Sequence, residues 1–363
     1  MFGLLRGKPC FIFSLDRPYP HEVFNSQKKL KYTGFIFSPK RRISHITVRG
    51  EKSVQKFSLV YERKDLISFL PQLREVHKSG FCFNWQTGPE NLSFLVQEGI
   101  RKYTIASYNW RKIWKEHLWW LKTKELLSSQ NVVPPPELIA LTQGTANPQA
   151  YFGSILVGAW IFKKIFSKWT LPKNILDFGC GSGRLTLSWW LLKKEQKENL
   201  QLFGTDIQQN LIFWAQEHLP KEINFSLNFL DPPLPFSDQW FDFIFAVSVF
   251  THLSFFRQKL WIKEFYRLLK PGGKLLLTLH GRPYVETLLT DKKQKEFLRK
   301  GFLELPTVHE GKNDFVTFHR PGFVAKEFSS CFHCLRFWPE GDLGQPFPFR
   351  LAFLQDVYLF ERA

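Results

Sequence analysis

The sequence lacks an apolar run long enough to cross a bilayer, and it contains few cysteines. Its longest apolar segment, Ile155 to Phe166, is interrupted by Lys163 and Lys164, whereas a transmembrane helix needs about 20 apolar residues. The five cysteines are odd in number and follow no framework spacing, which argues against a disulfide-stabilised secreted protein. Since no secretory leader is apparent either, we expect a cytoplasmic protein with no membrane span.

Motifs for metal ions and nucleoside triphosphates are also missing. Cys331 and Cys334 form a single Cys-x-x-Cys pair without a second pair or a His-x-x-x-His, so we expect no metal site. The glycine-rich stretch 179–183 is followed by Arg184 and Leu185 and therefore lacks the Gly-Lys-Ser/Thr end of a Walker loop. Its glycines alternate instead of following G-x-G-x-x-G, which disfavours a dinucleotide fold.

Positive charge is concentrated at the front of the chain. Residues 1–130 hold 23 Lys and Arg against 10 Asp and Glu, a balance of +13, whereas the remainder holds 27 against 22, a balance of +5. A basic front region suits nucleic acid, an anionic lipid surface or a phosphorylated substrate. A solvated lysine-rich surface explains the same pattern, so the charge alone does not choose a partner.

Three regions follow from the periodicity of the apolar residues. Residues 1–107 contain short aromatic and β-branched runs between turn residues, which predicts a small all-β module similar to a β-sandwich. Residues 108–137 predict a helical connector and a stiff linker at Pro134-Pro135-Pro136. Residues 138–363 alternate helical patterns with apolar strands, which predicts an α/β domain with a mostly parallel, Rossmann-like sheet covered on both faces.

The α/β domain is organised around residues 174–184. Apolar residues surround Asp177, three glycines follow at alternating positions, and an amphipathic segment begins at Leu185. This pattern predicts a buried strand, a tight turn and a helix, with a polar ligand at the carboxyl edge of the sheet. We expect later strands near 200–205, 223–227, 241–247, 274–279, 316–318, 335–338 and 353–360, and helices near 148–169, 208–218, 253–269, 283–300 and 323–330.

Further segments stand in a characteristic order after the turn. They are Gly204-Thr205-Asp206-Ile207, Leu234-Pro235-Phe236, Phe241-Asp242-Phe243-Ile244 and Leu269-Lys270-Pro271-Gly272-Gly273-Lys274. With the turn, this set resembles class I S-adenosylmethionine-dependent methyltransferases over about residues 131–363. The seven-stranded sheet of that family is therefore expected. Four shorter segments resemble a bacterial subgroup associated with glycan and cell-surface biosynthesis: 134–137, 232–235, 248–253 and 278–281.

The resemblance implies S-adenosyl-L-methionine as the cofactor and gives roles to nine residues. Asp177 and the turn residues Gly179, Cys180 and Gly181 would hold the methionine end. Asp206 would accept the ribose hydroxyls, Ile207 would pack on the adenine, and Asn228 and Phe229 would meet its edge. Ser248 would face the sulfonium and the acceptor. For Ile207 and Phe229, plain core packing is the alternative.

Two histidines are placed at the carboxyl edge of the sheet by the same alignment of strands. His252 follows the fourth strand and His280 closes the fifth. An imidazole suits the deprotonation of a hydroxyl near neutral pH. We expect His280 to be the base, since Gly281 beside it permits an exposed turn. The alternative is that either histidine only shapes the pocket.

The function we expect is O-methylation of a small-molecule or glycan hydroxyl. One alternative is an RNA or protein methyltransferase that grips its substrate with the basic front region, and another is a non-catalytic binding protein. The segment from Asp231 to Leu234 is similar to a signature of nucleic-acid amino methyltransferases. It precedes the fourth strand and lacks the stacking aromatic, so nucleic acid stays an alternative only. The sequence leaves the oligomeric state open.

Overall fold

The structure is a computed structural model that describes residues 12–17, 30–38, 42–63, 77–85, 91–98, 101–109, 116–143, 146–306, 309–311, 315–341 and 354–363. The chain divides into two compact units: residues 1–122 form most of the first, and residues from 123 onward, apart from short segments, form the second. Among the described residues, every helix is too short or too polar to span a lipid bilayer.

The first unit contains two antiparallel sheets. One has the order β1 (Ile12–Arg17), β2 (Leu30–Phe37), β5 (Gly80–Trp85), and the other the order β4 (Val54–Ser58), β3 (His45–Arg49), β6 (Asn91–Glu98), β7 (Arg101–Asn109). Phe83 of β5 and Phe94 of β6 are buried with their ring centroids 6.3 Å apart. Aromatic packing thus joins the two sheets. A β-rich unit is in keeping with the sequence, and its classification as a β-sandwich stays a prediction.

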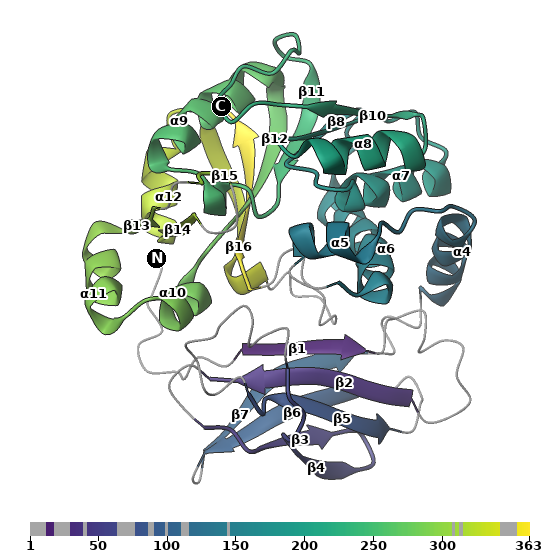
Figure 1. The fold of residues 1–363 in the computed structure, drawn as a ribbon, viewed down its shortest axis with the longest axis vertical. Coiled ribbons are helices and arrows are strands. Elements are labelled where there is room, and N and C mark those ends of the chain that lie inside the picture. The colour runs from purple at the N-terminus through teal and green to yellow at the C-terminus, as the bar shows by residue number, and fades with distance from the viewer. Residues whose placement is uncertain are drawn as a thin grey trace. The chain divides into compact units, whose positions relative to one another are not determined.

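The second unit is built on the predicted seven-stranded sheet (Figure 1). Its strand order is β10 (Ile223–Leu227), β9 (Gln201–Asp206), β8 (Asn174–Phe178), β11 (Phe241–Ala246), β12 (Leu269–Leu279), β16 (Asp356–Arg362), β15 (Phe332–Trp338). The five strands from β10 to β12 are parallel, whereas β16 pairs antiparallel with both β12 and β15. The expectation of a Rossmann-like, mostly parallel sheet is confirmed.

Helices cover both faces of this sheet, because alternate residues of the buried strands point to opposite sides. On one face, Phe178 packs on Trp261 and Phe265 of α9 (Phe255–Leu268), in the same cluster as residues of α12 (Pro321–Glu327). On the other face, Phe243 contacts Trp189 of α7 (Arg184–Gln196), and Phe162 of α6 (Pro148–Ile165) lies beside them.

The other described elements connect or flank these parts in sequence. They are α4 (His117–Ser128), α5 (Pro136–Gln143), the 3-10 turns η2 (Phe166–Lys168), η3 (Phe250–His252) and η4 (Pro339–Gly341), α8 (Gln209–His218), α10 (Arg282–Leu288), α11 (Asp291–Lys300), and the hairpin of β13 (Phe302–Leu305) with β14 (Val316–His319). Strand β13 has no counterpart among the sequence predictions.

Three predicted boundaries are wrong. The linker predicted up to residue 137 already contains the start of α5, because Pro136 fits the first turn of a helix. The single helix predicted over 283–300 is two helices, since Thr290 is extended and immediately precedes α11. Strand β12 begins at Leu269 rather than after Pro271-Gly272-Gly273, with a register shift between Phe241 and Phe243 of its neighbour.

Candidate functional site: the carboxyl edge of the parallel strands

The turn between β8 and α7 adopts the left-handed backbone that its glycines permit. Gly179, Gly181 and Gly183 have φ angles of +73°, +56° and +82°, which side chains with a Cβ rarely adopt. The amides of Gly179 and Cys180 donate to the carbonyl of Thr205 at 2.7 and 2.9 Å. The turn is thereby closed against the end of β9.

Cys180 is directed into the protein. Its side chain is buried, burial raises the pKa of its thiol well above the usual value, and its Sγ donates to the carbonyl of Gly181 at 3.5 Å. Because both its thiol and its amide are used inside the turn, its place in the cofactor site, still a prediction, depends on its backbone alone.

Two helices that precede the sheet in sequence lie against the glycine turn. A Cβ added to Gly181 would approach Cγ2 of Thr142, at the end of α5, to 2.7 Å. The buried hydroxyl of Tyr151 in α6 donates to the carbonyl of Ser182 at 3.1 Å. Residues from outside the family segments therefore border the expected position of the methionine end, which sequence reasoning missed.

Asp177 is a buried carboxylate beneath the turn. The hydroxyl of Thr186 in α7 donates to its Oδ2 at 2.7 Å, and desolvation by burial raises the pKa of Asp177 to about 7. Arg184 and the Thr186 hydrogen bond act in the opposite direction. Burying an ionised carboxylate costs free energy unless a partner compensates its charge. A cationic or hydrogen-bond-donating ligand group, such as the ammonium group of the cofactor's methionine end, is suited to that role.

Asp206 joins the glycine turn to the end of β9. Its Oδ2 accepts the amide of Gly181 at 2.8 Å, and its Oδ1 accepts the amide of Gln208 at 2.8 Å. Burial raises its pKa, while these amides lower it. Since a carboxylate has about four acceptor positions, Asp206 keeps capacity for the hydroxyls of a ribose.

Asn228 and Phe229 follow β10 with contrasting environments. Asn228 is 7% exposed, and within the described part of the chain its Oδ1 has no hydrogen-bond partner. Phe229 is 82% exposed, so core packing does not explain this residue. Ile207 is partly buried, and its Cδ1 lies 3.1 Å from where a Cβ on Gly311 would be.

These residues fit an adenosine ligand. The unpartnered Oδ1 of Asn228 is a buried acceptor, and such atoms are rare in proteins unless a ligand or water completes them. The amino group of an adenine could donate to this oxygen, and the exposed ring of Phe229 lies next to it in sequence. The carboxylate of Asp206, with its spare acceptor positions, matches the two hydroxyls of a ribose. The chemistry of the donor set therefore agrees with S-adenosylmethionine.

Ser248, at the end of β11, is held in a strained conformation. Its φ is +62°, which is uncommon for a residue with a Cβ and often marks functional sites. Its amide donates to Oγ1 of Thr278 at 2.8 Å, and its hydroxyl donates to Oε1 of Gln355 at 3.2 Å. Thr278 also donates to Gln355, at 2.6 Å, so three strand ends are tied together at this point.

His280 is buried at the end of β12, and the exposed turn expected at this position is wrong. The side chain is 5% exposed, because Gly281 leaves room for the carboxylate of Asp356, which a Cβ on Gly281 would approach to 2.3 Å. Tyr284 stacks on the imidazole with ring centroids 3.9 Å apart. Gln355 and Tyr284 also hydrogen-bond to each other. Neither was identified from the sequence.

The contacts of His280 determine which nitrogen is basic. Its Nδ1 lies 3.2 Å from the carbonyl of Thr317, and since a carbonyl only accepts, Nδ1 carries the proton and Nε2 is the basic nitrogen of the neutral ring. Burial, with smaller effects of His252 and His319, lowers the pKa of His280 well below its usual value. The ring therefore stays neutral at neutral pH, with its lone pair on Nε2.

His252 lies beside His280, as the sequence predicts. Their ring centroids are 6.2 Å apart, and Nδ1 of His252 donates to the carbonyl of Phe315 at 2.8 Å. A third histidine, His319, is buried and hydrogen-bonded through Nε2 to Gln258 at 2.9 Å; burial lowers its pKa to about 3. His319 is therefore neutral and part of the core.

The segment 309–311 lies against Ile207, which is expected to pack on the adenine. The amide of Gly311 donates to the carbonyl of His252 at 2.8 Å, and Glu310 accepts the amide of Ser254 at 2.6 Å. Arg257 forms ion pairs with both Glu310 and Asp231. Leu234 is buried in the core, so the Asp231–Leu234 segment has structural contacts and presents no ring for base stacking.

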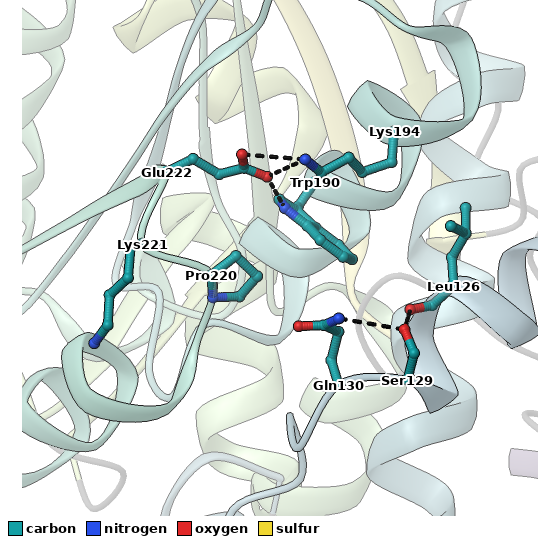
Figure 2. Close-up of a pocket in the computed structure, with 8 residues that line it drawn as sticks. All are labelled: Leu126, Ser129, Gln130, Trp190, Lys194, Pro220, Lys221 and Glu222. Atoms are coloured by element: carbon teal, nitrogen blue, oxygen red, sulfur yellow. Dashed lines mark hydrogen bonds and ion pairs between the residues drawn. The ribbon is translucent and has the colours of Figure 1, made fainter.

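A cavity of about 430 Å³ lies elsewhere, beside α4 and the second half of α7 (Figure 2). Its wall includes Trp190 and Lys194, and Glu222 receives hydrogen bonds from both. Residues 220–222 precede β10, so this cavity is at the amino edge of the sheet. The predicted site residues lie at or after the carboxyl ends of strands, and the cavity is therefore separate from them.

Within the described residues, no group of three or more His, Cys, Asp or Glu could hold a metal ion, and the expectation of no metal site stays a prediction. Cys331 is partly buried against the core cluster, Cys334 is exposed, and both are free thiols.

Comparison with known proteins agrees with this geometry. Residues 176–277 match the family described as "Methyltransferase domain". The tRNA N(3)-methylcytidine methyltransferase trm140 of Schizosaccharomyces pombe is 30% identical over 116 residues, 30% of this chain and 37% of that protein. The phosphoethanolamine N-methyltransferase of Plasmodium falciparum is 28% identical over 171 residues, 46% and 61% of the two chains.

Solved structures similar to this chain include the glycopeptide N-methyltransferase MtfA complexed with S-adenosyl-L-methionine. It has 16% sequence identity and a TM-score of 0.39, covering 57% of this chain and 93% of that one. The chain spans 35% to 61% of the length of the curated relatives it matches. The family match, the sheet and the glycine turn together show that the chain carries a class I S-adenosylmethionine-dependent methyltransferase domain.

Proposed function

We propose that this protein methylates a hydroxyl group of a small molecule or glycan. The observation that carries the proposal is the state of His280: a neutral imidazole at the carboxyl edge of β12, with Nδ1 on the carbonyl of Thr317. Because burial lowers the pKa of His280, the imidazole is unprotonated at neutral pH, and its Nε2 carries the lone pair that a general base needs.

When bound, S-adenosylmethionine would supply an electrophilic methyl group on its sulfonium. The chain's contribution is to align the acceptor oxygen with that methyl group, which is the main requirement of such a displacement. Ser248 lies between Thr278 and Gln355, and Tyr284 fixes the plane of His280. In this arrangement Nε2 of His280 would take the proton of the acceptor hydroxyl.

The rest of the site would hold the cofactor. Asp177, Gly179 and Gly181 would border its methionine part, Asp206 would accept from its ribose, and Asn228 from its adenine. The unpartnered Oδ1 of Asn228 supports this arrangement. We further propose a cytoplasmic location, where such a donor is made and used, and a bacterial glycan-modifying role on the strength of the subgroup segments.

Methylation of a nitrogen is the second candidate. Two curated relatives are named as tRNA N(3)-methylcytidine and phosphoethanolamine N-methyltransferases, and a neutral histidine suits an ammonium acceptor as well as a hydroxyl. The basic front region, with a charge balance of +13 over residues 1–130, favours an RNA acceptor. Binding to RNA would then weaken steeply with salt.

The first experiment is calorimetric titration with S-adenosylmethionine, in which the absence of binding by the intact chain would refute catalysis. A screen with methyl-labelled cofactor against nucleotide sugars, lipid-linked glycans, phosphoethanolamine and RNA then identifies the acceptor. Label in an alkali-stable ether of a sugar supports O-methylation. Label in RNA or in an amine refutes it in favour of the second candidate.

A further inference from the structure

Gln355 immediately precedes β16 and is buried at the carboxyl edge of the parallel strands. Strand β16 runs antiparallel to β12, and Asp356, its first residue, pairs with Leu279, the last residue of β12. Since the start of one antiparallel strand lies beside the end of its partner, a residue just before β16 comes close to this edge. Gln355 is 4% exposed, so its side-chain amide is held inside the protein.

The amide oxygen of Gln355 closes a ring of hydrogen bonds with two other strand ends. Its Oε1 accepts the hydroxyl of Thr278 at 2.6 Å and the hydroxyl of Ser248 at 3.2 Å. Oγ1 of Thr278 in turn accepts the backbone amide of Ser248 at 2.8 Å. A hydroxyl group has one proton and two lone pairs. Because both protons are donated to Gln355, the oxygens of Thr278 and Ser248 offer only lone pairs to any other partner.

Ser248 depends on this ring for its conformation and lies at a junction of the site. Its φ of +62° is uncommon for a residue with a Cβ, and its amide is held by Thr278. The next residue, Val249, lies against the glycine turn, where its Cγ2 would be 2.2 Å from a Cβ on Gly179. Thr278 belongs to β12, the strand that His280 follows. Partly exposed Ser248 therefore joins the expected cofactor end to the strand that carries the histidine.

We propose that Gln355 is a positioning residue that makes the oxygen of Ser248 a hydrogen-bond acceptor for the cationic centre of the cofactor. The inference rests on the proposed function, which brings a sulfonium to this edge of the sheet. Lone pairs attract a positive charge or a donor, whereas they gain nothing from a neutral thioether. The site would thus favour the methyl donor over its thioether product. Gln355 would touch neither ligand and would act through Thr278 and Ser248.

The test compares two ligands that differ at the position of the sulfur. S-adenosylhomocysteine has a neutral thioether there, and sinefungin has a carbon that bears an ammonium group. By titration calorimetry, Ser248→Ala should lower the preference for sinefungin over S-adenosylhomocysteine roughly 10- to 100-fold, as for loss of a hydrogen bond to a charged group. Gln355→Leu should lower it by a similar factor. Gln355→Glu keeps an oxygen that accepts both hydroxyls, so it should retain the preference within about threefold.

A double variant separates action through Ser248 from an independent effect of Gln355. Ser248→Ala combined with Gln355→Leu should lose no more preference than Ser248→Ala alone, because the two residues act on the same contact. Gln258→Leu is the matched control. Gln258 is a buried glutamine whose amide donates to the carbonyls of Phe250 and Leu253. Its replacement should lower stability and leave the preference between the two ligands unchanged.

Several results would overturn the assignment. Equal losses for both ligands in Gln355→Leu, or additive losses in the double variant, would make Gln355 a structural residue only. An unchanged preference in Ser248→Ala would remove the acceptor role of its oxygen. If Gln355→Leu fails to fold, Thr278→Val breaks the same ring, and an unchanged preference in that variant refutes the proposal. Failure of the unaltered chain to bind either ligand would instead refute the proposed function, and the inference with it.

Discussion

The amide of Gly181 donates a 2.8 Å hydrogen bond to the carboxylate of Asp206, and this bond links the glycine turn to the strand that follows it in the sheet. Gln208 occupies the other oxygen of Asp206. The carboxylate thus organises the free protein and offers its remaining acceptor positions to the ribose.

Asp206→Ala should therefore affect both stability and ligand binding. Hydrogen bonds to a charged group contribute about 1.5–3 kcal/mol each when buried. We therefore expect a loss of about 2–4 kcal/mol in the free energy of unfolding. We also expect the affinity for S-adenosylhomocysteine to fall at least tenfold. Urea unfolding and calorimetry measure the two effects. Unchanged affinity in a folded Asp206→Ala variant would contradict the ribose assignment.

Two glycines with nearly the same φ allow the energetic cost of backbone strain to be measured apart from the cost of side-chain crowding. Gly179 has φ +73°, and its added Cβ would lie 2.2 Å from Cγ2 of Val249, whereas Gly272 has φ +72° and nothing within 4 Å. Gly272→Ala should cost about 1–2 kcal/mol of unfolding free energy for the left-handed backbone. Gly179→Ala should cost about 1–3 kcal/mol more, for overpacking.

Urea denaturation of the two variants measures this difference. Adding Val249→Ala to Gly179→Ala should recover most of the extra loss, since it removes the methyl group that clashes. Equal losses in the two single variants would mean that Val249 moves aside freely.

The sequence predicts the cofactor end of the site better than the acceptor end. The glycine turn, Asp177 and Asp206 are read from local patterns, because a strand, a left-handed turn and a helix start are each specified within a few residues. The acceptor end depends on contacts between distant segments. Gln355 reaches Ser248 across 107 positions and Thr317 reaches His280 across 37, and no local periodicity encodes such pairs.

The wrong expectation for Gly281 has the same cause. A glycine beside a histidine suggests a free turn when only neighbours in sequence are considered. In the structure, the antiparallel strand β16 brings Asp356 against Gly281, so the missing side chain makes room for a buried carboxylate.

Replacing Asn228 should weaken ligand binding and leave the stability of the fold nearly unchanged. Its Oδ1 is buried without a partner, so removing it relieves a desolvation cost of about 1–3 kcal/mol, offset by loss of the bond from Nδ2 to the carbonyl of Phe229. We expect Asn228→Ala to unfold within about 1 kcal/mol of the unaltered chain yet to bind S-adenosylhomocysteine at least tenfold more weakly. A large loss of stability with unchanged binding would make Asn228 a structural residue only.

Asp356 should make the stability of the fold depend on pH. Burial raises the pKa of its carboxyl from 3.8 to about 7 in the folded protein. The folded state therefore binds a proton that the unfolded state has released, and the stability present below about pH 4 is lost as the pH rises through 7. The slope is at most about 1.4 kcal/mol per pH unit.

Asp356→Asn keeps the acceptor for the amide of Glu340 but cannot ionise. Relative to the unaltered chain it should become progressively more stable between pH 4 and 7, with a constant difference above about pH 7.5. Urea unfolding at a series of pH values measures the difference. Parallel profiles for the two proteins would show that Asp356 ionises in the fold as readily as in the unfolded chain.

His280 should control the chemical step without contributing to cofactor affinity. Its Nε2 is the basic nitrogen, and burial holds its pKa well below 6.5. Activity should therefore persist without a loss due to this group from pH 8 down to pH 6.5, and fall only under more acidic conditions. His280→Gln should lower kcat by about 10²- to 10⁴-fold, the usual contribution of a general base, with S-adenosylhomocysteine binding unchanged. His333→Gln, at an exposed position of β15, is the matched control. Full turnover by folded His280→Gln on the identified acceptor would remove the base from His280 and leave His252 as the candidate to test next.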